Sequence, residues 1–231
     1  MRIIFALVFL TLTFVISVFF EEILSFLVVH LKSGWVFGSV YVRLLVIISF
    51  TIALFLAFSL FEKTKKIRFV YVFLIALLPA FGISFISPIY DVDYGMFDDD
   101  LKIAEMDSLS TATNGEFTFN EERIVAAFFT TGCPHCKAAC RKLAINKKAG
   151  QQITVHTFFS GNREDTDRFL KENNGEDFNS YLVSEKEQFM QFSGTTFPSV
   201  FVISPDGETE MHFSGDMINY TLLDYLLELS P

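Results

Sequence analysis

The chain has 231 residues, a formal net charge of −9 and 51% hydrophobic residues. Residues 1–90 hold seven Lys and Arg against three Asp and Glu, a net charge of +4, whereas residues 91–231 hold eleven against 24, a net charge of −13. Apolar runs long enough to cross a bilayer, which takes about 20 residues, dominate the first part, so the composition excludes an entirely soluble protein. With this acidic balance in the rest of the chain, we expect no nucleic-acid partner.

Three apolar runs predict an all-α transmembrane region of about three helices, at residues 3–20, 44–61 and 67–90. The first run is too long for a signal-peptide core and offers no small-x-small cleavage site, so we interpret it as an anchor. The loop at residues 62–68 carries four positive charges, and short basic loops stay in the cytoplasm. The chain after residue 90 is therefore predicted to lie outside the cytoplasm, in the periplasm of a cell whose inner (cytoplasmic) membrane holds the helices.

Two connecting segments complete the first half of the chain. Residues 21–43 are predicted to form an interfacial loop with Trp35 as aromatic anchor, and Arg43 to extend to the outer headgroups. The stretch after residue 90 is rich in acids and poor in apolar residues, which is typical of a solvated tether. The predicted division is a transmembrane helical anchor at residues 1–90, in contact with the lipid bilayer, an acidic tether at 91–115 and one soluble domain at 116–231.

Apolar runs and helical patterns alternate along the predicted soluble domain. The expected strands are residues 124–129, 153–159, 199–203 and 209–213, and the expected helices are residues 136–148, 162–172, 185–192 and a last one ending at 229. Asn162 and Asp216 are candidate helix caps. Strands that alternate with helices, followed by a terminal hairpin and helix, predict an α/β sandwich with a mixed sheet.

All three cysteines lie in the segment TTGCPHCKAAC, at positions 133, 136 and 140. Cys133 follows a buried strand and begins a helix, where unpaired backbone N–H groups and the helix dipole stabilise a thiolate. Cys136 is one turn further on, near enough to close a disulfide. Pro134 suits the first helical turn, and His135, if protonated, adds a positive charge beside the Cys133 sulfur. The spacing therefore predicts a redox pair tuned by Pro134 and His135.

The motif at residues 132–137, together with TTFPSVFV at residues 195–202, resembles the thioredoxin superfamily. The choice of Pro-His between the cysteines is similar to DsbA-type periplasmic oxidases, and the Pro-Asp-Gly turn after the second motif resembles the membrane-tethered TlpA/ResA group. The resemblance implies a thioredoxin-like three-layer sandwich, with Cys133 as nucleophile and Cys136 as resolving thiol. It also implies that Pro198 is a cis-proline and that the Phe197–Pro198 peptide pairs with an extended substrate segment. Ala127 stands where the superfamily often has a buried acid.

These residues predict a membrane-anchored, extracytoplasmic thiol–disulfide oxidoreductase that acts on protein clients without a cofactor or a metal. The membrane part weakly resembles MauE/DoxX-type segments, which commonly have four helices. Residues 1–90 contain no cysteine and one histidine, so we expect a separate membrane redox partner or small thiols to recharge the site.

Two alternatives remain open. The three cysteines, joined by His135, His156 or His212, could bind or deliver zinc or copper. The domain could also be a thioredoxin-fold binding module without turnover. Cys140, which lies among alanines, is interpreted as a small buried residue rather than a third redox thiol.

Overall fold

The computed structural model describes residues 2–58, 71, 72, 74, 75, 77–79, 81, 82, 106–215 and 218–229. The chain divides into two compact units, Met1–Ile89 and Tyr90–Pro231. Most of the third predicted apolar run, residues 67–90, lies outside the described residues. The basic loop at 62–68 and the first part of the predicted tether also lie outside them.

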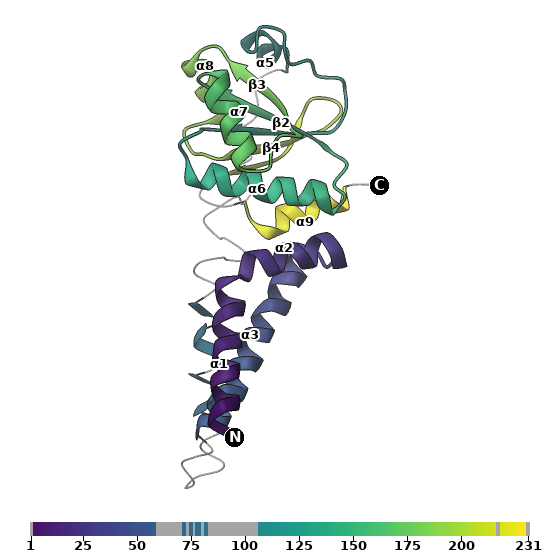
Figure 1. The fold of residues 1–231 in the computed structure, drawn as a ribbon. Helices are drawn as coiled ribbons and strands as arrows, with labels where there is room; N and C mark the ends of the chain where they lie inside the picture. The colour runs from purple at the N-terminus through teal and green to yellow at the C-terminus, as the bar shows by residue number, and fades with distance from the viewer. Residues whose placement is uncertain are drawn as a thin grey trace. The chain divides into compact units, whose positions relative to one another are not determined.

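The N-terminal unit contains α1 (Arg2–Val18), α2 (Phe20–Leu31) and α3 (Trp35–Phe58) (Figure 1), and the described residues between 71 and 82 are also helical. Within α3, the stretch Trp35–Ala57 is long and apolar enough to cross a membrane. Helices α1 and α2 are each too short to pass the same test alone, and they pass it only together, as one span with a bend of 72°. A buried hydrogen bond of 2.8 Å joins Thr13 of α1 to Ser49 of α3. The described residues thus contain one candidate span, or two if the bent pair is a single span.

The prediction of an interfacial loop at residues 21–43 is wrong. Helix α2 occupies most of that segment, and α3 begins nine residues before the predicted run. The apolar side chains of α2 that are buried recur every fourth residue, which makes one buried stripe on a helix. Trp35 is 2% exposed, and the Arg43 guanidinium lies 5.0 Å from the centre of the Phe20 ring. Both side chains therefore pack within the unit instead of reaching out of it.

A five-stranded mixed sheet forms the centre of the C-terminal unit. Its strands are β1 (Ile124–Phe129), β2 (Thr154–Ser160), β3 (Asn179–Val183), β4 (Ser199–Ile203) and β5 (Thr209–Ser214). They lie in the order β3-β2-β1-β4-β5, with β1, β2 and β3 parallel to one another and β4 antiparallel to both of its neighbours. Strand β1 is central and buried along its whole length, as its uninterrupted apolar sequence predicts. The predicted α/β architecture with a mixed sheet is confirmed.

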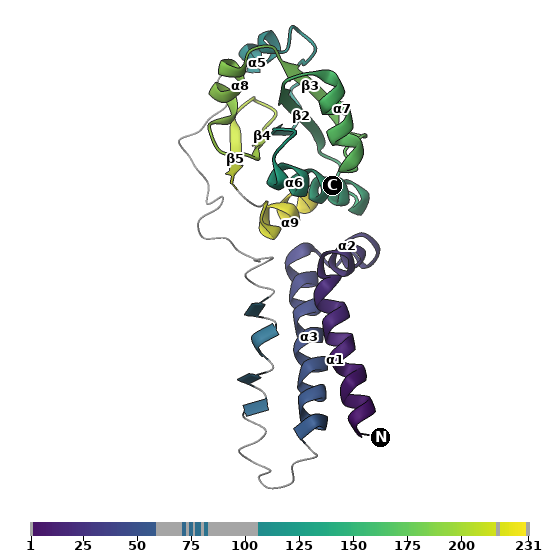
Figure 2. The ribbon, with the colours of Figure 1, turned by 60° about the vertical axis from the view of Figure 1, so that its left-hand side comes forward.

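Helices cover the sheet on both faces. They are α5 (Met106–Ala112), α6 (Pro134–Ala149), α7 (Arg163–Glu172), α8 (Lys186–Ser193) and α9 (Tyr220–Glu228). In both views α6 and α9 lie together on one side of the sheet, and α5 and α8 lie on the other (Figures 1 and 2). The side chains of β1 point alternately to the two faces of the sheet, as in any strand. Phe128 stacks on Phe158 and meets Phe189 of α8, whereas Phe129 packs against Phe169 of α7.

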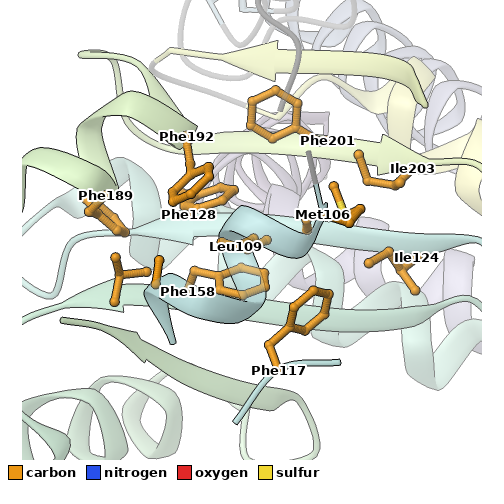
Figure 3. Close-up of a cluster of buried hydrophobic side chains, with 13 residues drawn as sticks. Met106, Leu109, Phe117, Ile124, Phe128, Phe158, Phe189, Phe192, Phe201 and Ile203 are labelled. Carbon is orange, nitrogen blue, oxygen red and sulfur yellow. The ribbon is translucent and has the colours of Figure 1, made fainter. Parts of the chain in front are cut away.

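Two elements of this unit were not predicted. Strand β3 escaped the sequence pattern because it is a short edge strand that begins with polar residues and is only partly buried. Helix α5 lies inside the range predicted as an acidic tether, yet Leu109 is fully buried in the core beneath β1 and β2 (Figure 3). The carbonyl of Ala112 also accepts a hydrogen bond of 3.0 Å from the Ser184 N–H. The folded unit therefore begins no later than Met106, ten residues before the predicted boundary.

One of the two predicted helix caps is observed, and the other helix is capped by a different residue. Asn162 caps α7 through a hydrogen bond from the Asp165 N–H, as predicted. Helix α9 is capped by Asn219, whose side chain accepts from the Leu222 N–H at 2.8 Å. Asp216, the residue predicted for that cap, lies outside the described residues.

Candidate functional site

Cys133 occupies the cap position at the beginning of α6. Strand β1 ends at Phe129, and a short turn closed by a hydrogen bond from the Cys133 N–H to the Thr130 carbonyl leads into the helix. The Cys133 sulfur accepts a hydrogen bond of 3.3 Å from the backbone N–H of Cys136. Pro134, at the first helical position, has no N–H that the turn would leave unpaired. The half-buried Cys133 sulfur thus lies where a helix N-terminus favours an anion.

Cys136 is chemically unlike Cys133, because its side chain is completely buried. Burial raises the pKa of the Cys136 thiol to about 12, and the neighbouring Cys133 adds to that rise, whereas hydrogen bonds from Thr130 act in the opposite direction. The Thr130 hydroxyl lies 4.0 Å from the Cys136 sulfur. All three cysteines are free thiols in this structure. The site therefore pairs one accessible sulfur with one that keeps its proton at neutral pH.

The loop before β4 lies next to the Cys133 sulfur. The peptide bond between Phe197 and Pro198 is cis. The Cys133 thiol lies 3.8 Å from the Phe197 carbonyl, to which it donates a hydrogen bond. The Phe197 ring stacks on Phe189 of α8, with 5.5 Å between the ring centres. Residues from two segments 64 positions apart thus meet at the N-terminus of α6.

Pro134 and His135, the two residues predicted to tune the pair, lie in the first turn of α6. Pro134 is exposed and His135 is half-buried. Thr130, by contrast, was not singled out from the sequence. Its position at the end of β1, three residues before Cys133, is the signal that could have found it. Ala127 is fully buried in β1, so this strand presents no carboxylate where the superfamily often has one.

Cys140 lies one turn beyond Cys136 and is fully buried. Burial raises the pKa of its thiol to about 12. A methyl group built on Gly175 would lie only 2.7 Å from the Cys140 sulfur and 2.9 Å from the Leu170 side chain. The Cys140 side chain therefore fills space next to a glycine, in agreement with its interpretation as a small buried residue.

Of the three histidines offered as further metal ligands, His156 and His212 are held within the sheet. His156 of β2 lies 3.1 Å from the Tyr181 hydroxyl, and burial lowers its pKa to about 4. His212 of β5 is joined to the Ser199 hydroxyl at 2.8 Å and stacks on Phe201. Within the part of the chain that the structure describes, no group of three or more His, Cys, Asp or Glu residues could hold a metal ion. The metal-binding alternative gains no support there.

A protein-family model described as a thioredoxin-like domain matches residues 115–230, half of the chain. The chain belongs to the thioredoxin-like family. The superfamily predicted from the two motifs is therefore confirmed, and with it the thioredoxin-like fold. No curated protein matches the sequence significantly.

Solved structures with a similar fold are distant in sequence. A secreted disulfide oxidoreductase of Mycobacterium tuberculosis homologous to Escherichia coli DsbE is 15% identical, with a TM-score of 0.42 over 48% of this chain and 84% of that one. StoA from Bacillus subtilis is 21% identical, with a TM-score of 0.39 over 46% and 82%. The thioredoxin domain of a thiol-disulfide oxidoreductase from Bacteroides vulgatus is 14% identical, with a TM-score of 0.43 over 61% and 100%. The family assignment rests on the family match and not on these likenesses.

Proposed function

We propose that this protein is a membrane-anchored thiol–disulfide oxidoreductase that exchanges disulfides with protein clients outside the cytoplasm. The observation that carries the proposal is the Cys133 sulfur, half-buried at the helix N-terminus and 3.3 Å from the Cys136 N–H. A buried second thiol one turn away supplies the partner that a dithiol enzyme needs. Membership of the thioredoxin-like family supports the same class of reaction.

The reaction consists of two exchanges at sulfur. In the reducing direction, the Cys133 thiolate attacks a client disulfide, the Cys133–client bond forms, and one client sulfur leaves and takes up a proton. Cys136 then gives up its proton and attacks the Cys133 sulfur. The Cys133–Cys136 disulfide forms as the second client sulfur leaves and is protonated. Oxidation of a client dithiol runs the same steps in reverse, and the reduction potentials of the pair and its partners set the direction.

The Phe197–Pro198 segment is the proposed contact for the client chain. The Phe197 carbonyl lies beside the Cys133 sulfur, in the loop that leads into strand β4. An extended client segment that pairs with this backbone would bring its own sulfur toward Cys133. Pro134 and His135, from the first turn of α6, are proposed to tune the stability of the Cys133 thiolate.

The proposed location is the cytoplasmic (inner) membrane, with several helices as anchor and the C-terminal unit in the periplasm. The apolar stretch Trp35–Ala57, the bent pair before it and the basic loop at residues 62–68 support this arrangement. Residues 1–90 contain no cysteine and only His30 as a histidine, so they hold no thiol pair for a relay through the bilayer. We therefore propose that a separate membrane protein or small thiols recharge Cys133 and Cys136.

Trapping of a mixed disulfide tests the proposed roles. In the full chain, Cys136→Ser should accumulate a covalent adduct with insulin, a model protein disulfide, because the resolving thiol is gone. Cys133→Ser should form little adduct, and Cys140→Ser should behave as the wild type. Equal trapping by the first two variants would overturn the assignment. Stoichiometric zinc or copper after purification under reducing conditions, without thiol exchange, would favour a metal-binding module instead.

A further inference from the structure

The buried thiol of Cys136 has no carboxylate beside it in β1. The side chain of Cys136 is fully buried, and so is that of Ala127. Burial holds the pKa of the Cys136 thiol at about 12, far above neutral pH. A thiolate is the nucleophile in disulfide exchange, so this proton must leave whenever Cys136 attacks the Cys133 sulfur. It must return whenever Cys136 becomes the leaving group. Both directions of exchange therefore need a group that can take and give a proton at this sulfur.

The polar side chain of Thr130 contacts the Cys136 sulfur. Its hydroxyl oxygen lies 4.0 Å from that sulfur, within the range of a hydrogen bond to sulfur. Thr130 is half-buried, whereas Cys136 is fully buried, so Thr130 contacts the buried sulfur and is itself partly exposed to solvent. A hydroxyl group both donates and accepts, as a relay requires. The hydrogen bonds from Thr130 also lower the pKa of Cys136, which means that they favour its thiolate over its thiol.

The fold holds Thr130 in this place. The residue directly follows the buried strand β1, and its carbonyl accepts a hydrogen bond of 3.1 Å from the Cys133 N–H. The turn into α6 thus ties the backbone of Thr130 to the first residue of the redox pair. The Thr130 hydroxyl lies next to the sulfur of the second residue of the pair, Cys136.

We propose that the Thr130 hydroxyl carries the proton between the Cys136 sulfur and solvent during the exchange at Cys133. This inference rests on the proposed oxidoreductase function and assigns a step within it. When Cys136 attacks, its proton passes to the Thr130 oxygen as the Thr130 proton passes to a solvent water. The Cys133–Cys136 bond forms, and the client sulfur leaves and is protonated from solvent. When the enzyme disulfide is opened, Thr130 returns a proton to Cys136 by the reverse path. No oxidant, reductant or further group is required.

A chromogenic aromatic disulfide, dithiobis-nitrobenzoate, separates the two steps. Attack by Cys133 of the reduced full chain releases one coloured thiolate, and attack by Cys136 on the resulting mixed disulfide releases a second. Cys136→Ser should show only the first release, which identifies the second as resolution. Thr130→Val should slow the second release by about tenfold or more and leave the first unchanged, because only resolution needs the proton of Cys136 to move.

Two comparisons separate a proton relay from a structural effect. Thr130→Ser keeps the hydroxyl and should restore the second release to near the wild-type rate, whereas Thr130→Ala removes the hydroxyl without the bulk of valine and should remain slow. Thr131→Val makes the same change one residue further on and should have no effect. Resolution by Thr130→Val or Thr130→Ala at the wild-type rate, or a Thr130→Ser variant as slow as these two, would overturn the proposal. If the wild type releases no coloured thiolate through Cys133, the oxidoreductase function itself is wrong.

Discussion

The sulfur of Cys140 lies against Gly175, just beyond the end of α7. This contact joins the helix that carries both proposed redox cysteines to the segment that leads into β3. Because the sulfur would be 2.7 Å from a methyl group at position 175, the glycine is a packing requirement and not a matter of backbone freedom.

We expect Gly175→Ala to destabilise the protein by about 1–3 kcal/mol, since an added methyl group in a packed core forces its neighbours to move. Thermal or denaturant unfolding of the C-terminal unit measures the loss. Gly132→Ala is the matched control, because a methyl group there would meet no atom within 4 Å. Combining Gly175→Ala with Cys140→Ala should recover part of the lost stability. Equal effects of Gly175→Ala and Gly132→Ala would contradict the packing argument.

Protonation of His156 should make the free energy of unfolding depend on pH under acidic conditions. Its pKa in the folded protein is lowered from 6.5 to about 4 by burial, so the unfolded chain binds a proton that the folded protein does not. The free energy of unfolding should therefore fall as pH decreases from about 6.5 to about 4, by about 1–2 kcal/mol after allowance for partial exposure. Below that range His156 should contribute no further change.

Denaturant unfolding at several pH values measures this slope. His156→Gln removes the titrating group and should flatten the curve between the two pH values. A curve that His156→Gln leaves unchanged would show that other groups cause the acid sensitivity.

Helix α5 illustrates how a short element is held by tertiary contacts. It has seven residues, too few to be stable alone in water, yet Leu109 lies fully buried against the sheet (Figure 3). Leu109→Ala should lower the free energy of unfolding by about 2–5 kcal/mol, through lost burial and the cavity left behind. Ser108→Ala, on the exposed side of the same helix, should change it little. Two variants of equal stability would mean that α5 is not part of the cooperative unit.

The sequence predicted those elements whose apolar pattern is long or unbroken. Strand β1 and helix α7 were placed within one residue, because a six-residue apolar run and a capped amphipathic segment carry strong local signals. Strand β3 and helix α5 were missed because their stability comes from neighbours far along the chain. Strand β3 pairs with β2 at a sheet edge, and α5 is a seven-residue helix with three apolar residues that follows an acidic stretch. Local composition does not report such contacts.

The candidate site, too, was predicted only where the sequence signals are local. The residue types and spacing of the cysteines predicted Cys133 at a helix N-terminus, since strand and helix signals are both local. The contact of Thr130 with Cys136 was not foreseen, because it depends on how the chain turns between β1 and α6.

The orientation of the whole chain can be measured by a reporter. Alkaline phosphatase, which is active only outside the cytoplasm, should be active when fused after Pro231, because the basic loop at residues 62–68 is retained inside. The same enzyme inserted within that loop, after Lys65, should be inactive, which supplies the internal control. The reverse pattern would place the redox cysteines in the cytoplasm and overturn the proposed location.

The unequal exposure of Cys133 and Cys136 has a consequence for the clients. Two accessible sulfurs could give two isomeric mixed disulfides with every client, one at Cys133 and one at Cys136. Only the adduct at Cys133 is the intermediate of the proposed reaction. Since Cys136 is 0% exposed, the sulfur of a proposed client would reach Cys133 and not Cys136. The attachment is regioselective before any recognition of the client takes place. Under the proposed function, every client would therefore be released by the same intramolecular step, the attack of Cys136 on the Cys133 sulfur.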